Sequence, residues 1–212
     1  MPLLDSVDKI VSVYLAAVCK EEFTYRNIRY GPRPLSVSPL LFRGFTCPPR
    51  CGGCCPRFSL DYLPAEEHPY PLTRRSVSVN GREVEFWSDL QRDHSDYHCR
   101  NLDPATGRCG IYERRPFSCD FELIRFIHRQ QDAILTQKLF GRGWAMLRVD
   151  GERRALCEMT PATAWTTSEV VRKLGRLRLW ADHLGVVTWL DEIIAWVETG
   201  PHDSPLRLPP PE

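Results

Sequence analysis

The feature that most constrains this chain is a short stretch, CPPRCGGCC, which begins at residue 47 and holds four cysteines: Cys47, Cys51, Cys54 and Cys55. The prolines and glycines between them predict a loop. Gaps of two or three residues allow several sulfur atoms to converge on one centre, because the backbone between them can turn tightly. Zinc and iron–sulfur centres both use thiolates held in this way, so the stretch is predicted to bind metal.

Two of these cysteines, Cys54 and Cys55, are adjacent. Side chains of adjacent residues diverge in most backbone conformations, so the pair is not expected to bind one single ion. Three alternatives remain. The pair serves two separate ions, it serves two metals of one polynuclear cluster, or one cysteine is a ligand while the other packs.

A second group of cysteines follows at even spacing, with nine residues in each gap between Cys99, Cys109 and Cys119. The stretch DPATG between the first two predicts the turn of a short hairpin, across which Cys99 and Cys109 approach one another. Cys119 follows ERRPF, at the start of a predicted short helical turn. Cys157 stands apart from both groups and is a candidate eighth ligand.

The number of thiols bears on the kind of centre. Seven or eight thiolates exceed the four that one tetrahedral zinc ion accepts, which favours two metal sites or a polynuclear centre. His94 and His98 flank the second group and are candidate nitrogen ligands, although a surface or hydrogen-bonded role is more common for such histidines. Cys19, outside both groups, is expected to be a small buried hydrophobe.

Charge and cysteine usage narrow the class of protein. The net charge of +1 over 212 residues argues against a dedicated nucleic-acid surface. The first residues lack a basic region and no long apolar run follows, so neither a signal peptide nor a membrane span is predicted, and a cytoplasmic location is expected. Thiols stay reduced there, and a cysteine cluster is more often a metal site than a disulfide framework.

Hydrophobic patterning predicts an α+β fold. An N-terminal helix is expected from six apolar residues that share one helical face: Leu3, Val7, Ile10, Val11, Tyr14 and Val18. Residues 24–46 are expected to be extended. Valines and a phenylalanine alternate on either side of Asn80-Gly81, which predicts a hairpin with a type I′ turn. Residues 121–140 are read as a third hairpin, with a helix as the alternative.

The C-terminal part is predicted to be a helical pair. One helix opens on Ser/Thr capping residues and closes on Gly185, and the next closes on Gly200. The expected architecture is one small domain over residues 1–205, with a cysteine-bound irregular core at 45–121 and helices within 165–200. Residues 206–212 are predicted to be a flexible tail.

The two cysteine blocks together resemble a known family. CPPRCGGCC followed by YHCRNLDPATGRCGIYERRPFSC is similar to the cysteine-cluster family that takes its name from the motif C-x-x-C-x-x-C-C and is described as a zinc- or iron-chelating domain. The elements of the family's second block fall on Cys99, Gly107, Cys109, Ile111, Tyr112, Arg115, Pro116 and Cys119. The resemblance implies metal binding at the seven cysteines of the two blocks.

This sequence differs from the family's motif at two positions, and a related domain bears on the kind of metal centre. The first gap of the motif is three residues here instead of two, and Asp120 stands where the family often has arginine. A related domain in flagellin lysine N-methylases is associated with a four-iron cluster. The resemblance therefore implies either zinc or an iron–sulfur centre, with 4Fe-4S as one form of the latter.

Two functions follow from these two metals. With zinc, the centre is closed and structural, and the protein is an interaction module for a protein partner. With iron, the chain is a protein-modifying or redox enzyme, or its accessory subunit. The spacing of Cys47, Cys51 and Cys54 also matches radical S-adenosylmethionine enzymes, but the expected hairpins and helices do not form the βα barrel that those enzymes use. Glu66, Glu67 and His68 are read as a helix start or a solvated loop, and no catalytic residue is predicted.

Overall fold

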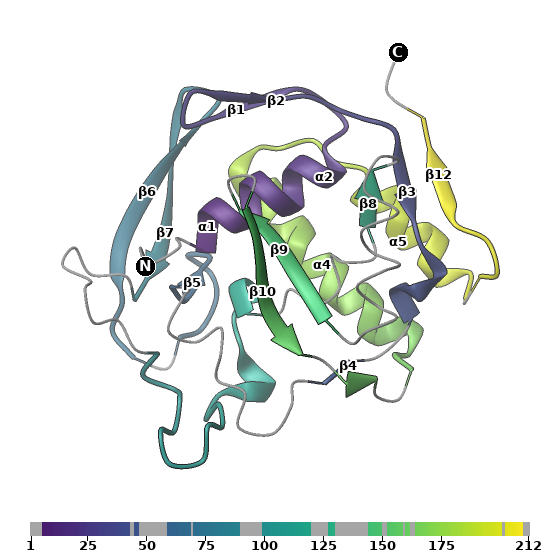
Figure 1. Cartoon of the computed structure of the whole chain (residues 1–212). Coiled ribbons are helices and arrows are strands. Elements are labelled where there is room, and N and C mark those ends of the chain that lie inside the picture. The colour runs from purple at the N-terminus through teal and green to yellow at the C-terminus, as the bar shows by residue number, and fades with distance from the viewer. Residues whose placement is uncertain are drawn as a thin grey trace.

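The structure is a computed structural model that describes residues 6–42, 45–46, 59–68, 70–89, 99–119, 127–129, 144–149, 152–158, 160–161, 164–200 and 202–209. It combines helices with antiparallel strands, as the predicted α+β class requires. In Figure 1 a curved sheet runs along the left and top of the molecule, a smaller sheet lies at the right, and helices lie between them.

The helical segments, in chain order, are α1 (Ser6–Lys9), the π-helix η1 (Ile10–Leu15), α2 (Ala16–Val18), the 3-10 turns η2 (Pro39–Phe42), η3 (Tyr112–Arg114) and η4 (Phe117–Cys119), α4 (Thr167–Leu184) and α5 (Leu190–Glu198). No helix among the described residues has the length and apolar character needed to cross a membrane.

Within the described ranges, the strands form four antiparallel sheets. The largest has the order β2 (Ile28–Tyr30), β1 (Phe23–Tyr25), β6 (Thr73–Val79), β7 (Arg82–Ser88), β5 (Asp61–Tyr62). The second has the order β12 (Leu206–Leu208), β3 (Leu35–Val37), β8 (Ile127–Arg129). The two remaining sheets pair β9 (Trp144–Val149) with β10 (Glu152–Glu158), and β4 (Phe45–Thr46) with β11 (Thr160–Pro161).

The N-terminal helix predicted from its apolar face is present as the continuous run α1–η1–α2. Its predicted core residues are buried, apart from Leu3, which lies outside the described residues. Cys19 follows directly and is 2% exposed, as expected for a cysteine that acts as a small hydrophobe. Its thiol lies 3.6 Å from the Ala16 carbonyl oxygen.

The hairpin predicted around Asn80-Gly81 is confirmed as β6–β7. Both turn residues have positive φ, 51° at Asn80 and 74° at Gly81, as a type I′ turn requires. The four alternating apolar residues, Val77, Val79, Val84 and Phe86, are all buried against the main core. Asn80 also receives a 2.7 Å hydrogen bond from the Thr24 main-chain N–H, which fastens the turn to β1.

The helix α4 begins and ends where its capping residues predict. Thr166 is the N-cap, and its side chain exchanges hydrogen bonds with Glu169 in a capping box. Gly185 ends the helix in the left-handed conformation, with φ of 69°. The buried face of α4 packs with α5, the N-terminal helix and the inner face of β6–β7 in the main hydrophobic core.

The end of the chain differs from its prediction. Residues 206–208, placed by the sequence analysis in a flexible tail, form β12 and pair with β3 in the register Leu206↔Val37 and Leu208↔Leu35. Alternation of leucine and arginine suits an edge strand whose leucines face the core, and both leucines pack against it. In the segment 121–140, the described part is β8, which pairs with β3, and the remaining residues of the predicted hairpin lie outside the described part of the chain.

Candidate metal centre

A second, smaller hydrophobic core lies beside the edge of the large sheet and contains cysteines of the second block. Its buried members are Leu60, Tyr62 and Cys99, and its partly buried members are Tyr70, Leu72, Trp87, Leu102 and Cys119. This set is called the Tyr62 cluster below. It joins residues from β5, from β7 and from the segment 99–119, so two of the three cysteines predicted in the second block meet in one apolar environment.

Strand alternation explains why this cluster is separate from the main core. Tyr62 of β5 pairs with Trp87 of β7, while the neighbouring pair is Asp61 and Ser88. Successive side chains of a strand point to opposite faces of the sheet. Phe86 therefore enters the main core and Trp87 enters the Tyr62 cluster.

The loop between Cys99 and Cys109 is held by its own backbone. The Leu102 N–H donates to the Cys99 carbonyl oxygen at 3.1 Å, and Leu102 and Cys109 form an isolated bridge. Gly107 has a φ of 66°, a left-handed conformation that glycine adopts at no steric cost because it has no Cβ atom. The predicted hairpin is thus a single bridge with a tight turn, not a pair of strands, among the residues described here.

The Asp103 side chain stabilises that turn. Its carboxylate accepts a 2.9 Å hydrogen bond from the Ala105 N–H and a second from the Thr106 hydroxyl. These hydrogen bonds, led by that of the Thr106 side chain, lower the pKa of Asp103. The DPAT sequence is therefore a side-chain-capped turn, the type that aspartate favours.

The segment from Cys109 to Cys119 folds as two short 3-10 turns. Tyr112 N–H donates to the Cys109 carbonyl oxygen at 3.3 Å, and Cys119 N–H donates to the Pro116 carbonyl oxygen at 2.9 Å. Cys119 is the last residue of η4, not the first residue of a helical turn as its sequence context predicts. Phe117 is fully buried and meets the Tyr14 ring edge-on at 5.9 Å, which anchors the turn to the N-terminal helix.

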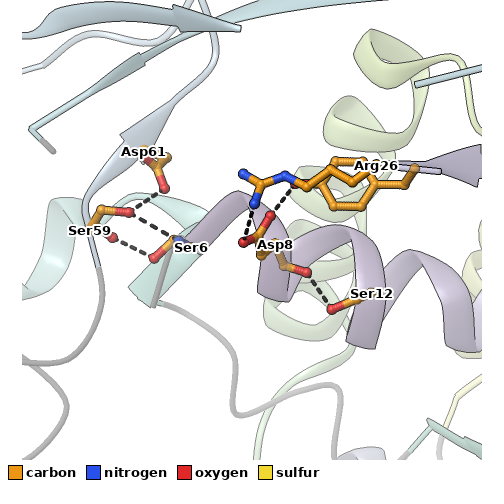
Figure 2. Close-up of polar contacts among 7 residues, drawn as sticks. Ser6, Asp8, Ser12, Arg26, Ser59 and Asp61 are labelled. Atoms are coloured by element: carbon orange, nitrogen blue, oxygen red, sulfur yellow. Dashed lines mark hydrogen bonds and ion pairs between the residues drawn. The ribbon is translucent and has the colours of Figure 1, made fainter. Parts of the chain in front are cut away.

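A buried polar network links this turn to the residues that follow the first cysteine block. The Ser118 hydroxyl accepts a 3.4 Å hydrogen bond from the Asp61 N–H. The Ser59 hydroxyl donates to the Asp61 carboxylate at 2.7 Å and accepts from the Ser6 N–H at 3.0 Å. Figure 2 shows Ser59 between Ser6 and Asp61, at the start of α1. Ser6, Ser59 and Asp61 are completely buried, so these hydrogen bonds fix the position of residues 59–61.

Two tyrosines lie next to the cysteines of this cluster. Burial, and then the neighbouring Tyr70 and Cys119, raise the pKa of Tyr62. Burial and Asp89 raise the pKa of Tyr70, and Cys99 adds to the effect. The Tyr62 hydroxyl is buried and has no hydrogen-bond partner among the described residues.

The described residues fit a thiolate-bound metal. Cys99 and Cys119 offer the sulfur ligands that zinc and iron–sulfur centres use, Cys99 buried and Cys119 partly exposed within the largely apolar Tyr62 cluster. The unsatisfied Tyr62 hydroxyl is a donor that a metal-bound thiolate would accept. Within the described part of the chain, no group of three or more His, Cys, Asp or Glu side chains forms a complete metal site.

The remaining predicted ligands lie in other parts of the chain. Those that lie outside the described residues are Cys47, Cys51, Cys54, Cys55, His94 and His98. Cys109 is described and partly exposed beside its bridge to Leu102, and it is not a member of the Tyr62 cluster. Cys157 lies in β10, opposite Ala145 of β9, at a register shift in the pairing. The residues Glu66, Glu67 and His68 occupy a turn and the loop after β5, which confirms the loop reading over a helix start.

Several residues of this region were not predicted from the sequence. Tyr62, Tyr70 and Asp61 carry no motif, and only the alternation in SLDYL, polar residues on one face and apolar on the other, could have indicated a strand with two environments. Their role depends on pairing with β7, which lies more than twenty residues along the chain.

Comparison with known proteins finds a family similarity in the central part of the chain. Residues 46–137 match the model of the CxxCxxCC family, described as "Putative zinc- or iron-chelating domain". This confirms the resemblance predicted from the two cysteine blocks and supports zinc or iron binding in general. The match spans all seven cysteines of the two blocks and ends before Cys157 and α4. Searches of curated proteins and of solved structures found no match to this chain.

Proposed function

We propose that this chain is a metal-binding protein in which thiolates of both cysteine blocks hold zinc or an iron–sulfur centre. The proposed ligands are Cys47, Cys51, Cys54, Cys55, Cys99, Cys109 and Cys119, with Cys157 as an eighth. The observation that carries the proposal is the convergence of the flanks of the two blocks. Ser59, four residues after Cys55, is joined through Asp61 to Ser118, the residue before Cys119.

Chain geometry makes this convergence restrictive. Four residues of fully extended chain span at most about 14 Å, so Cys55 is tethered within that distance of the buried Ser59. Cys99 and Cys119 are already side by side with Leu60 and Tyr62 in the Tyr62 cluster. This tether limits how far Cys55 can lie from the Tyr62 cluster, which supports a centre bound by thiolates of both blocks.

The other end of the first block supports Cys157 as a further ligand. Thr46, the residue before Cys47, pairs with Thr160, three residues after Cys157. Paired Cα atoms in an antiparallel sheet are about 5 Å apart. The β4–β11 pair therefore brings the chain on either side of these two cysteines together, although the family match ends well before Cys157.

Metal analysis of protein purified without oxygen tests the proposal. We expect stoichiometric zinc in a colourless sample, or iron and sulfide in a brown sample with broad visible absorption. The first result assigns a closed structural site in an interaction module. The second favours the alternative, a redox or protein-modifying enzyme or its subunit. Wild-type protein that binds neither metal, even after reconstitution, would contradict the proposal.

Two cysteine substitutions test whether metal loss is specific to the proposed ligands. One replaces a proposed ligand, and the other replaces a buried cysteine outside both blocks. Cys109→Ser is expected to lose most of the metal and to lower the unfolding temperature, because metal binding and folding are coupled. Cys19→Ser is the control, since this thiol is buried beneath the helix end and can be replaced by a hydroxyl that donates to the same Ala16 carbonyl oxygen. The control should retain full metal. Equal metal content in both variants would exclude Cys109 from the centre.

A further inference from the structure

The Tyr62 hydroxyl is a buried donor that the described part of the protein does not satisfy. Tyr62 is 2% exposed, and its oxygen has no hydrogen-bond partner among the described residues. A buried hydroxyl without a partner costs about 1–3 kcal/mol, so native proteins rarely retain one without a role. A phenylalanine would fill the same apolar space without this cost.

The neighbours of the Tyr62 ring are known from several contacts. The His68 ring meets it edge-on, with centroids 6.1 Å apart, and Trp87 is its partner across the β5–β7 pair. Tyr70 is close, but its hydroxyl accepts a 3.1 Å hydrogen bond from the Asn101 side-chain amide. Cys99 and Cys119 both belong to the Tyr62 cluster and are proposed metal ligands. Of these two cysteines, Cys119 is the one whose charge raises the pKa of Tyr62, so we take its sulfur as the acceptor.

A cysteine sulfur becomes a stronger hydrogen-bond acceptor when it binds a metal. A thiol sulfur accepts hydrogen bonds weakly, whereas a metal-bound thiolate keeps negative charge and accepts them well. Donors around a metal centre orient its ligands and stabilise the charge on them. In an iron–sulfur centre, hydrogen bonds to sulfur also raise the reduction potential, because they stabilise the more negative reduced state.

We propose that Tyr62 is a positioning residue of the metal centre, whose hydroxyl donates a hydrogen bond to a metal-bound thiolate, that of Cys119. This inference rests on the metal centre proposed above. It assigns to β5 a part in metal binding that its sequence does not indicate. It also explains why a tyrosine occupies a position at which the described residues provide no acceptor.

Tyr62→Phe tests the assignment, because it removes the hydroxyl and keeps the ring. In metal-loaded protein that contains zinc, competition with a chromophoric chelator should show about 10-fold weaker zinc binding. In protein that contains an iron–sulfur centre, potentiometric titration should show a more negative reduction potential. Tyr30→Phe is the matched control: Tyr30 is partly buried, stacks on Phe23 with centroids 5.1 Å apart, and packs against the main core, so its variant should match wild type.

The stability of metal-free protein gives a second readout. Because the hydroxyl lacks a partner among the described residues, Tyr62→Phe should leave the unfolding temperature of chelator-treated protein unchanged or raise it. The same variant should lower the unfolding temperature of metal-loaded protein. A loss of the same size in both states would assign Tyr62 to packing alone and overturn the proposal.

The outcomes distinguish this inference from the proposed function. If wild type binds no zinc and no iron, both fail. If wild type binds metal and Cys109→Ser loses it, while Tyr62→Phe has wild-type zinc affinity or reduction potential, only the role of Tyr62 is overturned.

Discussion

The guanidinium group of Arg176, in α4, donates a 2.8 Å hydrogen bond to the main-chain carbonyl oxygen of Arg115. The same nitrogen lies 3.5 Å from the Glu66 carboxylate, which in turn accepts a 2.7 Å hydrogen bond from the Leu63 N–H. Arg176 therefore fastens two segments to α4: the turn after β5, and the motif segment between Cys109 and Cys119.

Removing this connection should destabilise the protein. Arg176→Met keeps most of the side-chain stem but loses the polar contacts with Arg115 and Glu66. Hydrogen bonds that involve a charged group contribute about 1.5–3 kcal/mol, and this group is about three-quarters buried, with 22% of its side chain exposed. We expect the free energy of unfolding to fall by about 2 kcal/mol in chemical denaturation, and metal retention to fall with it.

Arg178→Met provides the control on the same helix. Arg178 pairs with Asp191 at 2.8 Å, but the side chains are 46% and 75% exposed, and such surface pairs contribute about 0–1 kcal/mol. Its variant should change unfolding little and metal retention not at all. If Arg176→Met and Arg178→Met lower the free energy of unfolding equally, the Arg176 contacts do not stabilise the protein more than an exposed ion pair does.

The buried carboxylate of Asp61 should be a second sensitive position. Asp61→Ala removes the acceptor of the Ser59 and Ser88 hydroxyls, both fully buried. Each orphaned donor costs about 1–3 kcal/mol, so the free energy of unfolding should fall by about 2–4 kcal/mol. Metal content should fall too, because the network fixes residues 59–61 beside Cys119. Asp191→Ala, at an exposed carboxylate, should have little effect on either measurement, and an equal effect would contradict this role.

Alanine substitutions at two glycines, Gly81 and Gly175, are expected to change the stability of the protein in opposite directions. Neither Gly81 nor Gly175 has another atom within 4 Å of an added Cβ, so a substitution acts through the backbone alone. Gly81 has φ of 74°, where alanine costs about 1 kcal/mol. Gly175 lies inside α4, where alanine gains about 1 kcal/mol. Thermal unfolding should show Gly81→Ala below wild type and Gly175→Ala above it, with unchanged metal content; a shift of the same sign in both would refute this account.

The capping box of α4 should contribute a pH-dependent stability. The Thr166 main-chain N–H, and then its hydroxyl, lower the pKa of Glu169 below the ordinary value of 4.5. Because the pKa is lower in the folded state, the contribution is complete above about pH 4.5 and is lost as the pH falls through the folded pKa. The stability difference between wild type and Glu169→Gln, measured in urea from about pH 7 to about pH 3, should shrink with acid. A constant difference would show that the charge of Glu169 is not involved.

Short sequence patterns predicted those elements of the fold whose conformation depends on interactions between residues close together in the chain. The capping residues of α4, the Asn80-Gly81 turn and the apolar face of the N-terminal helix each act over a few residues, and each is confirmed. The β1–β2 hairpin was missed, because its turn places Arg26 at φ of 46°, and arginine gives no signal for that conformation. Here a tertiary contact compensates: Arg26 pairs with Asp8 of α1 at 3.1 Å (Figure 2).

For the candidate site, the sequence names candidate ligands, which stay a proposal, but it does not predict the residues that surround them. The spacing of the cysteines points to metal because thiolate chemistry is specific to the residue type. The contacts of Tyr62, Asp61 and Arg176 depend on strand pairing and helix packing between segments far apart in the chain. No pattern within a short window carries that information.

The pairing of β12 with β3 also has a practical consequence. β3 lies between β12 and β8, so a recombinant version cut after residue 205 would leave one side of β3 without its strand partner. Unpaired strand edges recruit strands from other molecules and promote aggregation. Trimming the proline-rich residues 209–212 to aid crystallisation would leave β12 in place, whereas a cut before Leu206 would expose the edge of β3.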